Sequence, residues 1–404
     1  MRIIIPNLHA NWMLLKTSSV FVFKNSAATK HSYLLKYLLH DENIELCNYI
    51  NDRGFSLYTK GGGILQKFLN LFSVLENNII LKKNGINPHS ISIIRNISDI
   101  KSDDIVILYN IIPSGFRGME KVNAFKILSM IHFHGRAYEE ALIKKVGINC
   151  FMGEVNLSKT SKIFQEYYHF NLPWITHPFV FEERFVNNTP YSQRLNKCFS
   201  TGTITYKKHR EFLNIYGDSC NQPIRKLIKD NQSYYKDTID CYNSDYLEDN
   251  PGKSINAKDI ILVKYYKRFY NRTHIGKQTK YFSFNMVDKF NSYKMHVVGE
   301  EVLGVPGIGY VEGMACGSAY IGVESSMYKD LGLNPGTHYI SYDGTKEGLK
   351  TTIEFYQKEE NQLELSKIAK RGYEFVINNF CGEKVAKKLI QDIIKNFKQW
   401  QLNH

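Results

Sequence analysis

The stretch Gly304–Gly322, which reads GVPGIGYVEGMACGSAYIG, decides the fold that we expect for this chain. Its first six residues include three glycines and a proline, which favour turns and let a backbone approach a ligand closely. Glu312 follows, and we expect it in the first turn of a short helix of small residues, where the helix dipole favours a carboxylate. Gly317 is expected to end that helix.

The residues Ala319–Val323 after this helix are apolar and predict a strand. A loop, a helix and a strand in this order place Glu312 at the edge of an α/β sheet, where ligands bind. The neighbouring loop N–H groups, around Gly307 and Gly309, are suited to receive an anion. The alternative interpretation is an ordinary loop–helix–strand unit of any α/β protein.

The segment VEGMACGSAYIG (311–322) resembles the EAMACG-x-PVI signature of GT-B glycosyltransferases of the "glycosyl transferases group 1" type, which are similar to glycogen synthase. The resemblance implies an α/β chain with two Rossmann-like domains that face each other across a cleft. It implies that Glu312 contacts the ribose of a nucleotide-sugar donor and that the helix presents its N-terminal end to the donor phosphates. The family often carries a second glutamate eight residues earlier, where this chain has Gly304. Glu300 and Glu301 lie just upstream at a different spacing.

Length and composition fit such a chain. The 404 residues suffice for two domains with their own cores, and a hydrophobic fraction of 43% is typical of an ordered globular protein. The formal net charge of +13 suits anionic ligands such as nucleotide diphosphates, anionic membrane surfaces or nucleic acid.

The seven cysteines are scattered and odd in number, without a CxxC pair, which predicts reduced thiols and a cytoplasmic location. We expect no signal peptide, because the run Ile3–Ile5 is cut short by Pro6. No apolar run approaches the roughly 18–20 residues that span a bilayer, so any membrane contact is expected to be peripheral, on the inner face of the cytoplasmic membrane.

Strands alternate with helices along the chain, which predicts parallel, doubly wound sheets. We expect an N-terminal Rossmann-like acceptor domain at 1–181, a linker at 182–195 and a C-terminal nucleotide-sugar donor domain at 196–383. In the resembled fold, the C-terminal helix, here 384–404, packs back towards the N-terminal domain. The polar residues 230–258 are expected to form a long loop or insertion.

Transfer from a nucleotide sugar leaves negative charge on the departing phosphate. The chain contains no DxD motif, so we expect metal-independent transfer without a cofactor, with Lys, Arg and N–H groups stabilising that charge. Gly202 with Lys207 and Lys208 follows the first predicted strand of the donor domain, where the resembled family carries a basic residue that contacts the diphosphate. Lys294 is a second candidate phosphate ligand. The alternatives are solvated loop charges and a lysine at a strand edge.

His132 and His134 are the catalytic candidates. We expect them at the end of a strand of the acceptor domain, pointing to the same side because residues alternate along a strand. A neutral imidazole there can act as a base or can hydrogen-bond a sugar. The alternative is a buried structural histidine.

Two other features have weaker interpretations. His177-Pro178 resembles the dipeptide that bacterial sialyltransferases and some Kdo transferases use to hold a cytidine monophosphate donor, but it precedes the linker, and chance is the preferred interpretation.

The basic, tyrosine-rich stretch 264–281 is interpreted first as a solvated helix face, then as a surface for anionic lipid or glycan, and last as a nucleic-acid surface. Nucleic acid is not an expected partner.

The resulting hypothesis is a retaining glycosyltransferase that moves a sugar from a nucleotide-activated donor to a glycan or lipid-linked acceptor in bacterial surface polysaccharide synthesis. One alternative is a GT-B enzyme with a nucleoside monophosphate donor, or an epimerase. The other is a non-catalytic binding protein that kept the fold.

Overall fold

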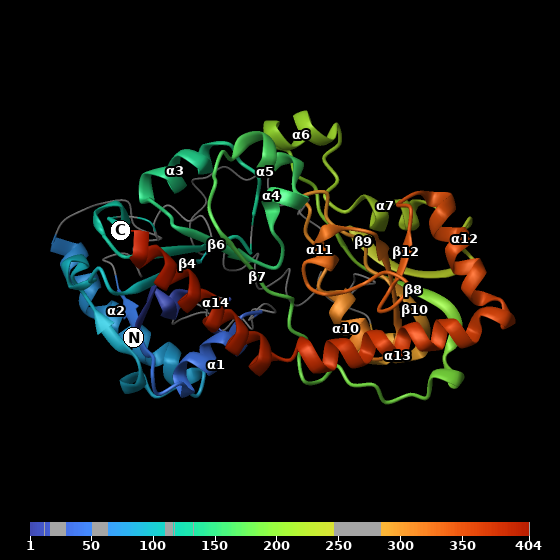
Figure 1. The fold of residues 1–404 in the computed structure, drawn as a ribbon, viewed down its shortest axis with the longest axis horizontal. Helices are drawn as coiled ribbons and strands as arrows, with labels where there is room; N and C mark the ends of the chain where they lie inside the picture. Colours follow the sequence, from blue (N-terminus) through green and yellow to red (C-terminus); the bar gives the residue numbers. More distant parts are fainter. Residues whose placement is uncertain are drawn as a thin grey trace. The chain divides into compact units, whose positions relative to one another are not determined.

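The structure is a computed structural model, and it describes residues 1–11, 13–16, 30–50, 64–109, 116, 118–131, 133–245 and 284–403, with backbone only for 64–72. The chain forms two compact units (Figure 1). Unit 1 comprises Met1–Lys159, Ile163–Val180 and Phe380–His404. Unit 2 comprises Thr160–Lys162 and Phe181–Asn379, so the predicted linker 182–195 lies within unit 2. The basic stretch 264–281 lies outside the described residues.

Unit 1 contains a seven-stranded parallel sheet in the order β3-β2-β1-β4-β5-β6-β7. From β1 the chain moves outward to one side through β2 and β3, and then returns to place β4 on the other side of β1. The strands are β1 (Arg2–Pro6), β2 (Glu45–Tyr49), β3 (Ser92–Ile94), β4 (Ile105–Tyr109), β5 (Phe125–Ser129), β6 (Cys150–Gly153) and β7 (Trp174–Thr176). The helices along this part of the chain are α1 (Ser32–His40), α2 (Ile64–Lys83), α3 (Tyr138–Val146), α4 (Leu157–Thr160) and α5 (Lys162–Tyr167).

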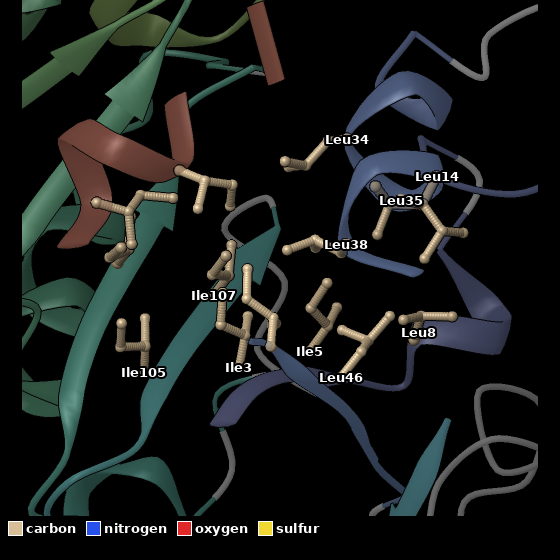
Figure 2. Close-up of a cluster of buried hydrophobic side chains, with 14 of the residues drawn as sticks. Ile3, Ile5, Leu8, Leu14, Leu34, Leu35, Leu38, Leu46, Ile105 and Ile107 are labelled. Carbon is tan, nitrogen blue, oxygen red and sulfur yellow. The ribbon is translucent and has the colours of Figure 1, made fainter. Parts of the chain in front are cut away.

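The core of unit 1 lies between this sheet and helices from both ends of the chain. Ile3 and Ile5 of β1 pack with Leu34 and Leu38 of α1 (Figure 2). Helix α14 (Gly382–Asn403) lies beside α1 and buries one apolar face in the same core through Ala386, Leu389, Ile390, Ile393 and Phe397. The recurrence of these residues every three or four positions is what gives the helix an apolar stripe.

Unit 2 contains a five-stranded parallel sheet in the order β12-β11-β10-β8-β9. The chain reverses its direction of travel across the sheet between β8 and β10. The strands are β8 (Leu195–Ile204), β9 (Ile239–Asp245), β10 (Tyr293–Val297), β11 (Ala319–Val323) and β12 (Ile340–Tyr342). The helices are α6 (Arg210–Tyr216), α7 (Pro223–Asp230), α9 (Met286–Ser292), α10 (Gly309–Ala315), α11 (Ser326–Lys329), α12 (Lys346–Gln357) and α13 (Gln362–Asn379).

Strand β9 corrects one prediction, because 230–258 was expected to be a loop. Ile239 and Cys241 alternate toward the core, and β9 pairs with β8 along its whole length. The polar Asn243 is also buried, and its side-chain amide donates to Ser200 Oγ at 2.8 Å. A strand that buries an asparagine lacks the apolar pattern by which strands are recognised.

Candidate functional site

The candidate site of unit 2 lies where β8 and β10 end. Ligands of open parallel sheets bind outside the carboxyl ends of the strands, at the point where the strand order reverses. In unit 2 that point lies between β8 and β10, and the Gly-rich loop 298–308 follows β10 directly. The quoted stretch therefore begins within the loop at the switch point of the sheet.

The loop turns tightly at Gly304. Glu301 N donates to Val305 O at 2.9 Å, and Gly304 N donates to Glu301 O at 2.9 Å. Gly304 has φ +81°, and a Cβ there would lie 2.2 Å from the carbonyl oxygen of Thr160. This turn therefore cannot hold the glutamate that the resembled family often carries at this position.

The two upstream acids serve the structure of unit 2. Glu301 accepts hydrogen bonds from Asn221 Nδ2 at 2.8 Å and from Gln222 Nε2 at 3.0 Å. Glu300 is buried, and its Oε1 accepts from the hydroxyls of Tyr320 at 3.0 Å and Tyr328 at 2.7 Å. Both carboxylates are thus engaged in fixing the surroundings of the loop.

Helix α10 carries Glu312 in its first turn, as predicted, and Glu312 is half-buried. The helix lies very close to β10, since a Cβ on Gly313 would come within 2.3 Å of His296 Nε2. Gly317 has φ +77°, and its N–H bonds to Met314 O at 2.9 Å, which confirms that it ends the helix. The small residues therefore set the distance between Glu312 and the sheet.

Arg225 of α7 is a member of the site that the sequence did not reveal. Its guanidinium is buried and donates to Val298 O at 2.5 Å, Thr203 O at 2.8 Å and Gly299 O at 3.4 Å. These carbonyls belong to the end of β8 and to the loop after β10. Arg225 therefore joins the two strand ends at the switch point and places a positive charge there.

Two glycines make room for this guanidinium. A Cβ on Gly202 would lie 2.6 Å from Arg225 Nε, and a Cβ on Gly307 would lie 2.5 Å from Arg225 Nη2. Gly202 also has φ +142°, a backbone conformation that favours glycine. The structure thus brings Gly202 and Gly307, which the sequence singled out, into contact with one cation.

The predicted lysines lie in different places. Lys207 is half-buried and Lys208 is exposed in the segment after β8, and Lys207 N donates to Ser219 O at 2.7 Å. Lys294 stands near the amino end of β10, where its Nζ donates to Gln362 Oε1 at 2.5 Å. Because that is the opposite edge of the sheet from the loop 298–308, Lys294 is not part of the site that we describe.

The two predicted histidines belong to unit 1. Strand β5 ends at Ser129, and residues 131, 133 and 134 do not continue it, so the expectation that His134 lies at the end of a strand is wrong. Phe133 N bonds to Met130 O at 3.1 Å, which marks a turn. His134 is exposed beyond this turn, and His132 lies outside the described residues.

His177 occupies a different setting from the one that its dipeptide suggested. It is buried directly after β7 of unit 1, and its ring lies 5.0 Å from that of His31. Burial lowers the pKa of His177 to about 4, so this imidazole is neutral near pH 7.

Neither metal-binding clusters nor membrane spans occur in the part of the chain that the structure describes. No three His, Cys, Asp or Glu side chains there stand close enough to hold an ion. Across the same described ranges, every helix is too short or too polar to cross a bilayer.

The fold is that of the GT-B class, with two α/β units that are each built on a parallel sheet. No family model matches the chain, and no curated protein matches its sequence. Among solved structures, the chain is similar to Anabaena Alr3699/HepE in complex with UDP, with 10% identity and a TM-score of 0.53 over 98% of this chain and 100% of that one. The same protein in complex with UDP and glucose gives 9% identity and a TM-score of 0.52 over the same shares.

Sucrose-phosphate synthase from Thermosynechococcus elongatus is also similar, with 11% identity and a TM-score of 0.50 over 99% of this chain and 100% of that one. Likeness at such low identity establishes the fold. It confirms the two-domain GT-B architecture that residues 311–322 predicted, while the narrower assignment to the group 1 type stays a prediction.

Proposed function

We propose that this chain is a glycosyltransferase that takes its sugar from a nucleotide-activated donor bound to unit 2. The observation that carries the proposal is the switch point of the second sheet, where the Arg225 cation contacts the Gly-rich loop that leads into α10 and Glu312. HepE, which shares the fold, has been solved with UDP and with UDP-glucose, which supports a donor of this class.

In the proposed reaction, the bond between the sugar and the phosphate breaks while a bond forms from the sugar to an acceptor hydroxyl, which loses its proton. The departing nucleotide gains negative charge. Arg225 would stabilise that charge, because a guanidinium in a buried site interacts strongly with phosphate oxygens. Lys207 and Lys208 would add charge from the segment after β8.

The remaining roles follow the resemblance. Glu312 would bind the ribose hydroxyls, and Gly307 and Gly309 would let the donor phosphates approach the backbone closely. His134 and His132 would contact the transferred sugar or the acceptor. We also propose metal-independent transfer with retention of configuration, to a glycan or lipid-linked acceptor of surface polysaccharide synthesis, by a cytoplasmic enzyme with peripheral contact to anionic membrane.

A nucleotide-binding experiment tests this proposal. Thermal shifts of the whole chain would be measured with UDP, GDP, ADP, CDP and CMP, each with and without EDTA. Ligands that bind the folded state raise the melting temperature by mass action. We expect a shift with one diphosphate that persists in EDTA and disappears in Glu312→Gln. Glu347→Gln, which changes an exposed first-turn glutamate of α12, is the matched control and should keep the shift.

The other outcomes separate the alternatives. A shift with CMP alone would favour the monophosphate donor class. Binding of a diphosphate without release of nucleotide from any matching nucleotide sugar would favour a non-catalytic binding protein. No shift with any nucleotide would overturn the proposal.

A further inference from the structure

Four polar side chains gather at the carboxyl edge of the sheet in unit 1. Tyr109 is the last residue of β4, Glu154 follows β6 directly, His177 follows β7 directly, and His31 precedes α1. His31, Glu154 and His177 are exposed by only 1%, 3% and 3%. Their contacts and chemistry are those of a binding site.

The contacts run through the His31 ring. Its Nε2 lies 3.5 Å from Glu154 Oε1, and its Nδ1 lies 3.2 Å from the Tyr109 hydroxyl. The rings of His31 and His177 meet edge to face with centroids 5.0 Å apart. On the far side, His177 Nδ1 lies 3.3 Å from Pro178 O and 3.5 Å from the Tyr33 hydroxyl.

Both imidazoles are neutral at ordinary pH. Burial, with the nearby charge of Lys30, lowers the pKa of His31 to about 3, and burial lowers that of His177 to about 4. Each ring therefore carries one N–H. The contacts assign it to Nε2 of His31, which faces the Glu154 carboxylate, and to Nδ1 of His177, which faces Pro178 O. His31 Nδ1 then accepts the Tyr109 hydroxyl proton, and His177 Nε2 is left as an acceptor.

Two acceptors of this cluster have no donor among the residues that the structure describes. Glu154 Oε1 and His177 Nε2 are fully buried, and no described residue donates a hydrogen bond to either atom. The 3.5 Å separation from His31 Nε2 is too long to satisfy the carboxylate oxygen. Leaving a buried acceptor without a donor is costly, so an unsatisfied pair in one place needs an explanation.

The chemistry of the pair defines what could satisfy it. A carboxylate oxygen and a bare imidazole nitrogen both require donors, and the carboxylate disfavours an anion. A neutral molecule with several hydroxyls supplies such donors. Lys30, Tyr33, Tyr109 and Pro178 around the cluster are only half-buried, so one side of it lies near the accessible surface.

We infer that Glu154 and His177 form a sugar-binding site in unit 1, in which two hydroxyls of the ligand donate to Glu154 Oε1 and His177 Nε2. His31 and Tyr109 act as positioning residues, because the Tyr109 hydroxyl holds the His31 ring and that ring packs edge to face against His177. The further statement that this sugar is the acceptor of the reaction rests on the proposed function. The statement that unit 1 binds a sugar is independent of the proposed function.

Saturation-transfer NMR on the full chain tests the inference. The probes are the methyl glycosides of glucose, galactose, mannose and N-acetylglucosamine, added without nucleotide. The variants are Glu154→Gln, which is nearly isosteric, and His177→Phe, which keeps an aromatic ring but removes both ring nitrogens. The matched control is Glu139→Gln, another buried carboxylate of unit 1, which accepts from the Tyr168 hydroxyl at 2.8 Å. Thermal melting and UDP affinity are measured for every variant.

We expect at least one glycoside to bind the wild type and the control Glu139→Gln. The same glycoside should bind Glu154→Gln and His177→Phe about tenfold or more weakly, because each variant loses a hydrogen bond to a charged or buried acceptor. UDP affinity should not change. Equal binding by Glu154→Gln and His177→Phe, or no binding of any glycoside to the wild type, would overturn the inference. A wild type that binds a glycoside but no nucleotide would instead overturn the proposed function alone.

Discussion

The two sheets of this chain use the same topology to bring different polar side chains to their carboxyl edges. In each, the chain moves outward from its first strand and then returns to the other side of it, at β1/β4 in unit 1 and at β8/β10 in unit 2. The carboxyl edge of unit 1 holds neutral imidazoles, phenols and one carboxylate. The carboxyl edge of unit 2 holds the Arg225 guanidinium among glycines, and the loop and helix that follow β10 add the carboxylates of Glu300, Glu301 and Glu312.

The difference teaches how one topology can serve two kinds of ligand. Parallel strands bring side chains from distant parts of the sequence to one edge, and the residue types there decide what binds. Hydrogen-bond acceptors that carry no proton favour a ligand with hydroxyl groups. A cation beside glycines, which let a ligand approach the backbone closely, favours phosphate. The predictions below test whether the two units differ as these residues indicate.

Acid should separate the two units most strongly. Burial lowers the pKa of three histidines in unit 1, His9 and His177 to about 4 and His31 to about 3, and lowers that of His296 in unit 2 to about 3. These rings stay neutral when folded but take up a proton when unfolded below pH 6.5. Stability is therefore lost as pH falls below 6.5, by about 1.4 kcal/mol per pH unit for each ring.

Urea unfolding between pH 7 and pH 5 measures this loss. All three tryptophans of the chain, Trp12, Trp174 and Trp400, belong to unit 1, so their fluorescence follows unit 1, while circular dichroism follows both units. His338 of unit 2 also has a pKa that partial burial lowers, so unit 1 has three such histidines and unit 2 has two among the described residues. We therefore expect unit 1 to lose stability more steeply than unit 2. His177→Phe should remove about a third of the slope of unit 1, and equal slopes in the two units would contradict the assignment of neutral buried histidines.

Gly313→Val should destabilise unit 2 alone. A Cβ at this position would overlap the buried His296 ring, so the substitution forces α10 away from β10 at a cost of about 3 kcal/mol. Thr351→Val places the same residue type at an exposed position of α12 without adding atoms to a packed contact, and should change stability by less than about 0.5 kcal/mol. An early transition in circular dichroism without a change in tryptophan fluorescence is the expected result, and a shift in both signals would contradict it.

Arg225→Met should weaken the binding of UDP roughly 50-fold and leave the binding of uridine unchanged, because the guanidinium is proposed to contact the diphosphate. Gly307→Ala should cause part of the same loss by displacing the guanidinium. Titration calorimetry measures both. Arg210→Met removes an exposed arginine of the same unit and serves as the control. A parallel loss of uridine binding would assign Arg225 to the structure of the loop instead.

Lys208→Ala should have the smallest effect. Its side chain is exposed, so salt screens its charge, and we expect UDP affinity to fall by no more than about threefold in 0.15 M salt. Calorimetry at low and high salt checks this. A tenfold loss that persists at high salt would move the main phosphate contact from Arg225 to the segment after β8.

Much of the fold follows from local sequence. The glycine punctuation of 304–322 fixed the end of α10 and the start of β11, and the alternation of elements predicted two parallel sheets. Such features depend on neighbours in sequence, which a single chain displays directly. The sequence did not predict strand β9, because its buried positions include an asparagine.

The site residues depend on contacts between distant parts of the chain. Arg225 stands in a charged helix, and only the packing of α7 beneath two strand ends makes it a buried cation. His31, Glu154 and His177 come from three separate segments that the sheet brings together. The sequence drew attention to His177 only through the His177-Pro178 dipeptide. That His31 and Glu154 lie beside it follows only from the strand order β3-β2-β1-β4-β5-β6-β7.

The return of α14 to unit 1 also orders events during synthesis. Unit 1 is built from the first and the last residues of the chain, with nearly all of unit 2 between them. A ribosome delivers α14 only after unit 2 has emerged, and domains generally fold as units as they emerge. The core around Ile3, Leu34 and Leu38 is completed only when Leu389 and Ile393 arrive, so we expect unit 1 to finish folding after unit 2.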